Sequence, residues 1–159
     1  MYQKEFADRL CAKPGDSLYS RLSVNTQLLS KTEHLLSVGK NNFRPPPKVD
    51  SAVVKITPKN PPPPINFVEW DGLVRLAFSR KNKTLGAIFR QKMVLGMLEN
   101  NYKTYCSVNN VQMEEIDFKE RVISILEKRE FDTCRAAKLN LEDFLQLLVM
   151  FNENGIHFS

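Results

Sequence analysis

Apolar residues recur at three- and four-residue intervals through the second half of the chain, which is the spacing of one face of an α-helix. Capping residues are expected at Thr84 and at Asn140, which stands three positions before Asp143. Gly155 is placed to end the last helix. We therefore predict a small bundle of four or five helices over residues 66–159. The first apolar stripe comprises Phe67, Trp70, Leu73, Val74, Ala77 and Phe78.

The middle of this half carries weaker signals. The segment that begins at Thr84 continues as an apolar run to Leu98, and the asparagine pairs at positions 100–101 and 109–110 are turn signals. Large apolar side chains are expected in the core of the bundle. These are Trp70, Met93, Met97, Met113 and Met150.

The first half begins with two helical patterns. Residues 1–11 place Phe6 and Leu10 four positions apart, and no capping residue precedes them. Such an abrupt start is typical of a chain cut inside a domain. After a turn, Asp16 or Ser17 is expected to cap a second helix.

Two short extended stretches follow, at residues 34–38 and 51–56. In the second stretch, Ala52, Val54 and Ile56 share one face of the predicted strand. A single pair of strands is only marginally stable in water. Residues 1–58 are therefore interpreted as the closing part of a larger α/β sheet, and not as a complete domain.

Two proline runs interrupt the regular pattern. Residues 45–47 fix φ and lack three N–H donors, so a stiff arm close to polyproline II is expected there. The arm would hold Phe43 beside a basic residue, which suits stacking on a nucleobase; a core anchor at a strand edge is the alternative. Residues 59–65 contain four consecutive prolines and predict a linker, with an SH3-type ligand as the minor alternative.

The composition is that of an ordinary globular protein. The 159 residues are 42% hydrophobic and 26% charged, with a net charge of +5. The isoelectric point of about 9.2 favours anionic partners, with nucleic acid first and an acidic membrane surface second. No apolar run is long enough to span a membrane, and the N-terminus has no signal-peptide pattern, so a cytosolic or nuclear location is expected.

The sequence has no recognisable catalytic frame of its own. Cys11, Cys106 and Cys134 are far apart and predict free thiols in a reducing compartment, with no zinc or other metal site. No nucleophile elbow, glycine-rich phosphate loop or paired carboxylates occur. The acidic residues Glu114, Glu115 and Asp117 are interpreted as a solvated loop.

A basic set around the turn between the first two predicted helices of the second half is the best local signal for a function. Such clusters neutralise phosphates without reading sequence, whereas a solvated helix face is the alternative. The set comprises Arg75, Arg80, Lys81, Lys83, Arg90 and Lys92.

Several stretches, in order, resemble the rRNA adenine N6-dimethyltransferases. The main one is residues 43–54, Phe-Arg-Pro-Pro-Pro-Lys-Val-Asp-Ser-Ala-Val-Val. Residues 3–10, 12–16, 21–24 and 80–85 also agree with the family. Residues 38–43, 59–67 and 151–159 specifically resemble the eukaryotic branch, the small-subunit (18S) rRNA dimethyladenosine transferases.

The resemblance implies what the chain contains and what it lacks. The family's glycine-rich S-adenosylmethionine loop and its Asn-Leu-Pro-Tyr motif do not occur, and the family pattern places both before Met1. Residues 1–58 would be the C-terminal part of a Rossmann-like class I methyltransferase sheet. Residues 66–159 would be a small all-α domain that docks RNA. S-adenosylmethionine is expected as cofactor of the full-length enzyme, and no cofactor for this chain alone.

The resemblance also assigns roles to residues. Phe43 would stack on the extruded target adenine, while Asp50 and Ser51 brace the arm. RNA contacts are expected from Arg80, Lys81 and Lys83 on the basic turn, and from Arg75, Arg90 and Lys48.

The implied enzyme dimethylates two adjacent adenosines near the 3′ end of small-subunit rRNA during ribosome biogenesis. Small-subunit rRNA and the pre-ribosomal particle are the expected partners of a monomer in the nucleus or nucleolus, with the cytosol as the alternative. A non-catalytic module that binds RNA or pre-ribosomes is the second hypothesis, and a helical protein-interaction domain is the third.

Overall fold

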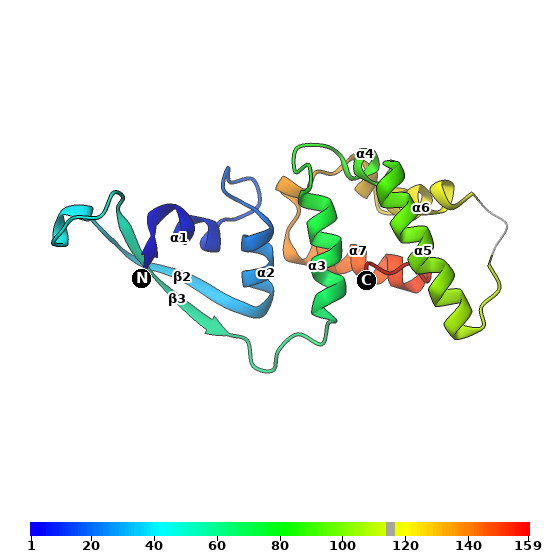
Figure 1. The fold of residues 1–159 in the computed structure, drawn as a ribbon, viewed down its shortest axis with the longest axis horizontal. Helices are drawn as coiled ribbons and strands as arrows, with labels where there is room; N and C mark the ends of the chain where they lie inside the picture. Colours follow the sequence, from blue (N-terminus) through cyan, green and yellow to red (C-terminus); the bar gives the residue numbers. More distant parts are fainter. Residues whose placement is uncertain (114–116) are drawn as a thin grey trace. The chain divides into compact units, whose positions relative to one another are not determined.

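The computed structural model describes residues 1–113 and 117–159, which form two compact units, Met1–Pro64 and Ile65–Ser159 (Figure 1). Unit 1 combines helices with a small sheet, and unit 2 is helical, as predicted. Glu114 and Glu115 of the predicted acidic loop lie outside the described residues.

Unit 1 is built around a three-stranded antiparallel sheet with strand order β1-β3-β2. The long β2–β3 pair runs from Ser30 opposite Pro58 to Val38 opposite Ser51, with a register shift between His34 and Leu36. The elements in chain order are β1 (Tyr2–Gln3), α1 (Lys4–Cys11), α2 (Arg21–Leu29), β2 (Ser30–Val38), the 3₁₀ turn η1 (Lys40–Asn42) and β3 (Ser51–Pro58).

Two boundaries in unit 1 differ from the prediction. Tyr2 and Gln3 do not begin a helix but pair with Ala52 and Ser51 as a strand. The strand predicted at residues 34–38 begins four residues earlier, at Ser30, because pairing with β3 continues through residues whose sequence carries no strand pattern.

The second helix of unit 1 is capped differently from the prediction. It begins at Arg21, and the N–H of Ser20 donates to Ser23 Oγ at 3.2 Å. The expected cap, Asp16, instead accepts a hydrogen bond of 2.7 Å from the N–H of Lys13 and closes the turn before it. The Asp16 side chain therefore bonds to the backbone of the preceding turn and does not cap the helix.

The core of unit 1 lies between its helices and the sheet. The side-chain amide of Gln27 in α2 donates to the carbonyls of Leu10 and Ala12, at 3.0 and 2.8 Å. These bonds satisfy carbonyls at the end of α1 that have no partner within the helix. The buried apolar residues are Ala7, Leu10, Ala12, Tyr19, Val24, Leu28 and Ala52.

Unit 2 contains five α-helices within its described residues, in agreement with the predicted bundle. They are α3 (Phe67–Phe78), α4 (Leu85–Phe89), α5 (Lys92–Asn109), α6 (Phe118–Glu127) and α7 (Leu141–Glu153), with the 3₁₀ turns η2 (Phe131–Thr133) and η3 (Ala136–Lys138) before α7. None of the helices in residues 1–113 and 117–159 is long and apolar enough to cross a bilayer.

The predicted helix starts in unit 2 are confirmed. The side chain of Thr84 accepts from the N–H of Ala87, and Asn140 and Asp143 form a reciprocal capping box at the start of α7. Gly155, with φ of +75°, lies just after the end of α7. These motifs are local in sequence, which is why they could be read without the fold.

Two predictions for unit 2 are wrong. The turn expected at residues 100–101 does not exist, because α5 passes through both asparagines and ends at Asn109. Met93, Met97 and Met113 are exposed, Met93 by 88%, whereas Trp70 and Met150 are buried as expected. In α5 the inward positions are taken by Val94 and Leu98, so each methionine one position earlier faces out.

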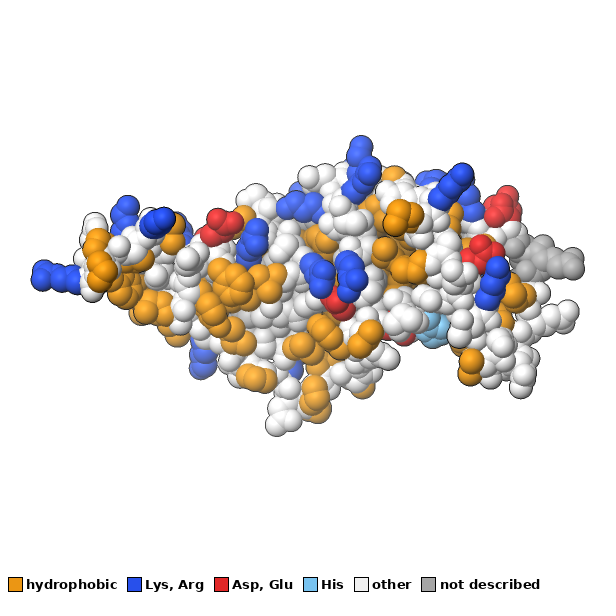
Figure 2. Space-filling view, in the orientation of Figure 1, with side chains coloured by type: hydrophobic (Ala, Val, Ile, Leu, Met, Phe, Trp, Pro, Cys, Tyr) orange, Lys and Arg blue, Asp and Glu red, His pale blue; other side chains and the backbone are white. Residues whose placement is uncertain are grey.

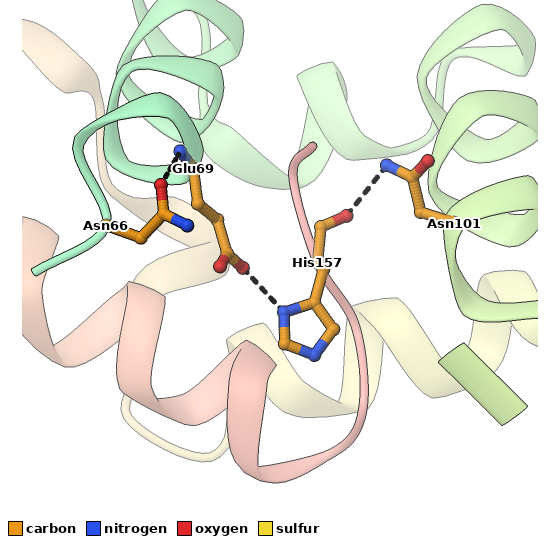
Figure 3. A network of polar contacts seen from close by, with 4 residues as sticks. All are labelled: Asn66, Glu69, Asn101 and His157. Carbon is orange, nitrogen blue, oxygen red and sulfur yellow. Dashed lines mark hydrogen bonds and ion pairs between the residues drawn. The ribbon is translucent and has the colours of Figure 1, made fainter. Parts of the chain in front are cut away.

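The C-terminal segment is part of the core of unit 2. Phe158 packs against Phe89 and Phe151, with ring centroids 6.3 and 5.2 Å apart. His157 Nδ1 lies 2.9 Å from the buried Glu69 carboxylate, and its carbonyl accepts from Asn101 Nδ2 at 2.9 Å (Figure 3). The last residues therefore connect α3 to α5.

Candidate functional site

Phe43 lies on a surface cavity of about 350 Å³ in unit 1. The ring is half-buried, and the cavity combines aromatic and proline surfaces with two residues that carry a hydroxyl, Tyr2 and Ser51. A flat base can stack on such surfaces, whereas the residues lining the cavity include no carboxylate or imidazole that could act as a base. The lining residues are Met1, Tyr2, Gln3, Phe43, Pro45, Pro47 and Ser51.

Hydrogen bonds to Asp50 fix the base of the arm that carries Phe43. Asp50 Oδ1 accepts from the N–H of Lys40 at 2.9 Å, and the Asp50 carbonyl accepts from the N–H of Lys4 at 2.9 Å. The N–H of Phe43 in turn donates to the Lys40 carbonyl at 3.4 Å. The predicted bracing role of Asp50 is confirmed.

The arm itself is not the straight polyproline II segment that was predicted. The backbone bends at residues 43–45 and again at 48–49, and the Arg44–Pro45 peptide bond is cis. Lys48 lies on the second bend and is exposed. Fixed φ angles make the prolines stiff, but they do not set the direction of the chain between them.

Arg80, Lys81, Asn82 and Lys83 form a loop between α3 and α4 that we call the basic loop. The N–H of Lys83 donates to the Arg80 carbonyl at 3.0 Å, which closes the loop as a turn. In Figure 2, Lys and Arg side chains gather over this edge of unit 2. Three of the predicted site residues, Arg80, Lys81 and Lys83, therefore lie together on this loop.

A segment about fifty residues later fastens the basic loop in place. Thr84 pairs with Arg135 in an antiparallel bridge, and the N–H of Leu85 donates to the Cys134 carbonyl at 2.8 Å. The N–H of Ala137 donates to the Lys81 carbonyl at 3.2 Å. Arg135 was missed by the sequence reasoning, because no local pattern indicates which distant loop it approaches.

Arg75 and Arg90 have acidic neighbours. Arg75 Nη2 lies 3.5 Å from Asp71 Oδ2 within α3. Arg90 lines a cavity of about 390 Å³ along α6, which also contains the carboxylates of Asp117, Glu120 and Glu127. The charges of both arginines are therefore offset locally, which makes them weaker candidates for phosphate binding.

Cys134 lies beside the basic loop but is not an activated thiol. Burial, together with the carboxylates of Asp143, Asp132 and Glu130, raises the pKa of the Cys134 thiol. Its Sγ donates to the Glu130 carbonyl at 3.5 Å. A raised pKa keeps the thiolate fraction of Cys134 low near neutral pH, so this thiol is poorly suited to nucleophilic chemistry.

Comparison with known proteins places the chain in one family. Residues 1–128 match the family described as "Ribosomal RNA adenine dimethylase". The whole chain is 60% identical to a "Probable dimethyladenosine transferase" of Drosophila melanogaster and 47% identical to a "Dimethyladenosine transferase" of Saccharomyces cerevisiae. It covers 52% of each, so the chain spans about half the length of the curated relatives it matches.

A solved structure agrees with the sequence comparison. The crystal structure of a dimethyladenosine transferase from Plasmodium falciparum matches 99% of this chain with a TM-score of 0.95 and 47% sequence identity. The match covers 57% of that structure's chain. The fold described above is therefore that of a segment of such a protein.

Proposed function

We propose, on the premise that this chain belongs to the ribosomal RNA adenine dimethylase family, that it forms the later half of an rRNA (adenine-N6,N6)-dimethyltransferase. The substrate would be two adjacent adenosines near the 3′ end of small-subunit rRNA, modified during ribosome biogenesis. In this account unit 1 supplies one wall of the adenine site, and unit 2 docks the RNA.

The observation that carries the proposed adenine site is the half-buried ring of Phe43 on a cavity whose lining residues include no carboxylate or imidazole. The lone pair of adenine N6 is delocalised into the ring, so the amine must be positioned by hydrogen bonds and stacking. Base–aromatic stacking contributes about 1–3 kcal/mol per base. Phe43 would hold one face of the extruded base, while the groups that accept hydrogen bonds from N6 belong to a motif absent from this chain.

The residues of this chain do not fit S-adenosylmethionine, the methyl donor expected for the family. In open α/β sheets such ligands bind at the carboxyl ends of parallel strands, next to a glycine-rich turn. The described strand pairs here are antiparallel, and none of the described strands β1, β2 and β3 is followed by a glycine-rich turn. We therefore propose that S-adenosylmethionine binds to the other half of the enzyme and not to this chain.

The basic loop supports RNA docking by unit 2. Lysine and arginine side chains that neutralise phosphates release condensed counterions, which gives affinity without sequence specificity. Sequence choice would then rest on the adenine site and on the shape of the rRNA. We further propose that the partner is small-subunit rRNA in a pre-ribosomal particle. The enzyme would be a monomer in the nucleus or nucleolus.

A second candidate function is a non-catalytic RNA-binding module. It is favoured by one observation: unit 2 has its own apolar core, and both sides of the basic loop are anchored within it. A product that contained only this chain would keep that loop and lack the cofactor site.

The intact mass of the endogenous protein, captured with an antibody against residues 66–159, separates the two candidates. A mass well above 18.3 kDa supports the enzyme, and a mass equal to 18.3 kDa supports the module. Calorimetric titration of the 159-residue chain with S-adenosylmethionine tests the cofactor assignment directly. We expect no binding, and stoichiometric binding would overturn the assignment.

A further inference from the structure

A second basic surface lies next to the basic loop, in a cavity of about 560 Å³ formed by the end of α6, η2, η3 and α7. Arg129, Arg135 and Lys138 line it, together with a single carboxylate, that of Asp143. We call it the η-turn cavity. We propose that the η-turn cavity binds a backbone phosphate of the same RNA strand that crosses the basic loop, an inference that rests on the proposed RNA docking.

The balance of charge in the η-turn cavity favours an anion. Three cations and one carboxylate line the cavity, and that carboxylate is already engaged at the start of α7, where Asp143 Oδ2 accepts from the N–H of Asn140 at 3.0 Å. The carboxylates of Asp132 and Glu130, which also act on the lining residue Cys134, are not themselves part of the lining. The positive end of the α7 dipole further offsets the charge of Asp143. The residues that line the η-turn cavity therefore carry a net positive charge, whereas the cavity around Arg90 and Lys119 is lined by three carboxylates.

The two arginines are held by neighbouring groups in a way that suits phosphate. Arg129 Nη1 lies 3.4 Å from Gln146 Oε1, which ties it across to α7. Arg135 Nε donates to the Asn82 carbonyl at 2.9 Å. Each bond uses one of the five N–H donors of a guanidinium. The remaining donors of the oriented group can still form hydrogen bonds with a phosphate.

Arg135 connects the η-turn cavity to the basic loop. The same side chain lines the cavity and donates to Asn82 of the loop, and the Thr84–Arg135 bridge joins the two backbones. A strand whose phosphates lie on Arg80 and Lys83 would therefore meet Arg135 next. Arg135 therefore belongs to both basic surfaces.

The test measures binding of a fluorescein-labelled RNA hairpin to the 159-residue chain over a series of potassium chloride concentrations. The variant Arg129→Gln/Lys138→Gln removes two charges from the cavity and leaves Arg135 to hold the loop. The matched control, Lys31→Gln/Lys103→Gln, removes two exposed lysines of β2 and α5 that pair with Glu33 and Glu99.

We expect the cavity variant to weaken binding and to lower the slope of log K against log salt by about 0.7–0.9, which is the change that the loss of one phosphate contact produces. An unchanged slope, or a change no larger than that of the control, overturns it. If replacement of Arg80, Lys81 and Lys83 still weakens binding in that case, the proposed RNA docking stands and only the cavity is excluded. If neither variant alters the slope, both proposals fall.

Discussion

Arg135 Nε donates a hydrogen bond of 2.9 Å to the carbonyl of Asn82, which lies 53 positions earlier in the middle of the basic loop. Together with the Thr84–Arg135 bridge, this bond adds long-range support to a turn that the hydrogen bond from Lys83 to Arg80 closes locally. A loop that is ordered before it meets its ligand loses less conformational entropy on binding. Arg135 is thus a positioning residue for the basic loop as well as a lining residue of the η-turn cavity.

Replacing Arg135 by Ala should loosen the basic loop without unfolding unit 2. The loss of one hydrogen bond to a charged donor should lower the free energy of unfolding by about 1–2 kcal/mol. Amide hydrogen exchange at residues 81–85 should become faster, while exchange in α5 stays the same. Unchanged exchange at these residues would show that the backbone bridge alone holds the loop.

Gly72 in α3 and Gly96 in α5 should respond to substitution by alanine in opposite directions. A Cβ at Gly72 would collide with the backbone carbonyl of Phe158, whereas nothing lies within 4 Å of the corresponding position at Gly96. Gly96→Ala should raise the free energy of unfolding by about 0.5–1 kcal/mol. Gly72→Ala should lower it, by roughly 1–3 kcal/mol as is usual for overpacking.

Urea unfolding of the two glycine variants checks this pair. Because the chemical change is identical, the difference between them isolates the packing of the C-terminal segment on α3. A stabilised Gly72→Ala variant would mean that Phe158 does not pack on α3 in solution.

The Cys134 thiol should lose its proton at a higher pH in the folded chain than in the unfolded chain. Its raised pKa means that the unfolded chain loses the thiol proton first, above its ordinary pKa of about 8.5, while the folded chain keeps it. The stability contributed by this thiol is therefore complete below that pH and is lost as pH rises through the folded-state pKa. Cys134→Ser should remove this part of the alkaline destabilisation.

The pH dependence of Cys134 alkylation by iodoacetamide, followed by mass spectrometry, measures the shift directly. The midpoint for the folded chain should lie above the midpoint for the same residue in concentrated urea. Coincident midpoints would show that neither burial nor the nearby carboxylates act on the thiol.

Phe43 should matter for methylation more than for folding. In a full-length protein that contains this chain, Phe43→Ala should lower kcat/KM for rRNA by about 5- to 150-fold, the equivalent of 1–3 kcal/mol of stacking. Phe43→Tyr should retain most of the activity because it keeps the ring. Equal losses in both variants, or none in Phe43→Ala, would argue that the ring only anchors the arm.

The helix caps of unit 2 could be predicted because each is a local motif. Thr84 and the Asn140–Asp143 box bond to residues within three positions of themselves, and Asn109–Asn110 correctly marked the end of α5. The pair Asn100–Asn101 has the same composition but lies inside α5, where Asn101 bonds to the carbonyl of His157. Local sequence could not distinguish the two pairs, because their difference lies in a contact 56 positions away.

The residues of the candidate site also fall into two groups, those that local sequence indicates and those that depend on contacts with distant residues. Phe43 and the basic loop stand out in the sequence as an aromatic before prolines and as a cluster of cations. The offset of Arg75 by Asp71 is local, but the carboxylates beside Arg90 and the approach of Arg135 depend on how α6 and η3 fold back. The cations alone therefore predicted the site only in part, because the fold decides which acidic residues lie beside each of them.

The measurement that tests the central claim most directly is the salt dependence of RNA hairpin binding by the 159-residue chain and by its Arg80→Ala/Lys81→Ala/Lys83→Ala variant. A control variant, Lys13→Ala/Lys31→Ala/Lys103→Ala, removes the same charge from elsewhere. The account predicts that the loop variant binds more weakly and that its slope of log K against log salt falls by about 2–3, while the control changes little. If the loop variant kept the affinity and slope of the unmodified chain, the basic loop would be a solvated surface and unit 2 would not dock RNA through it.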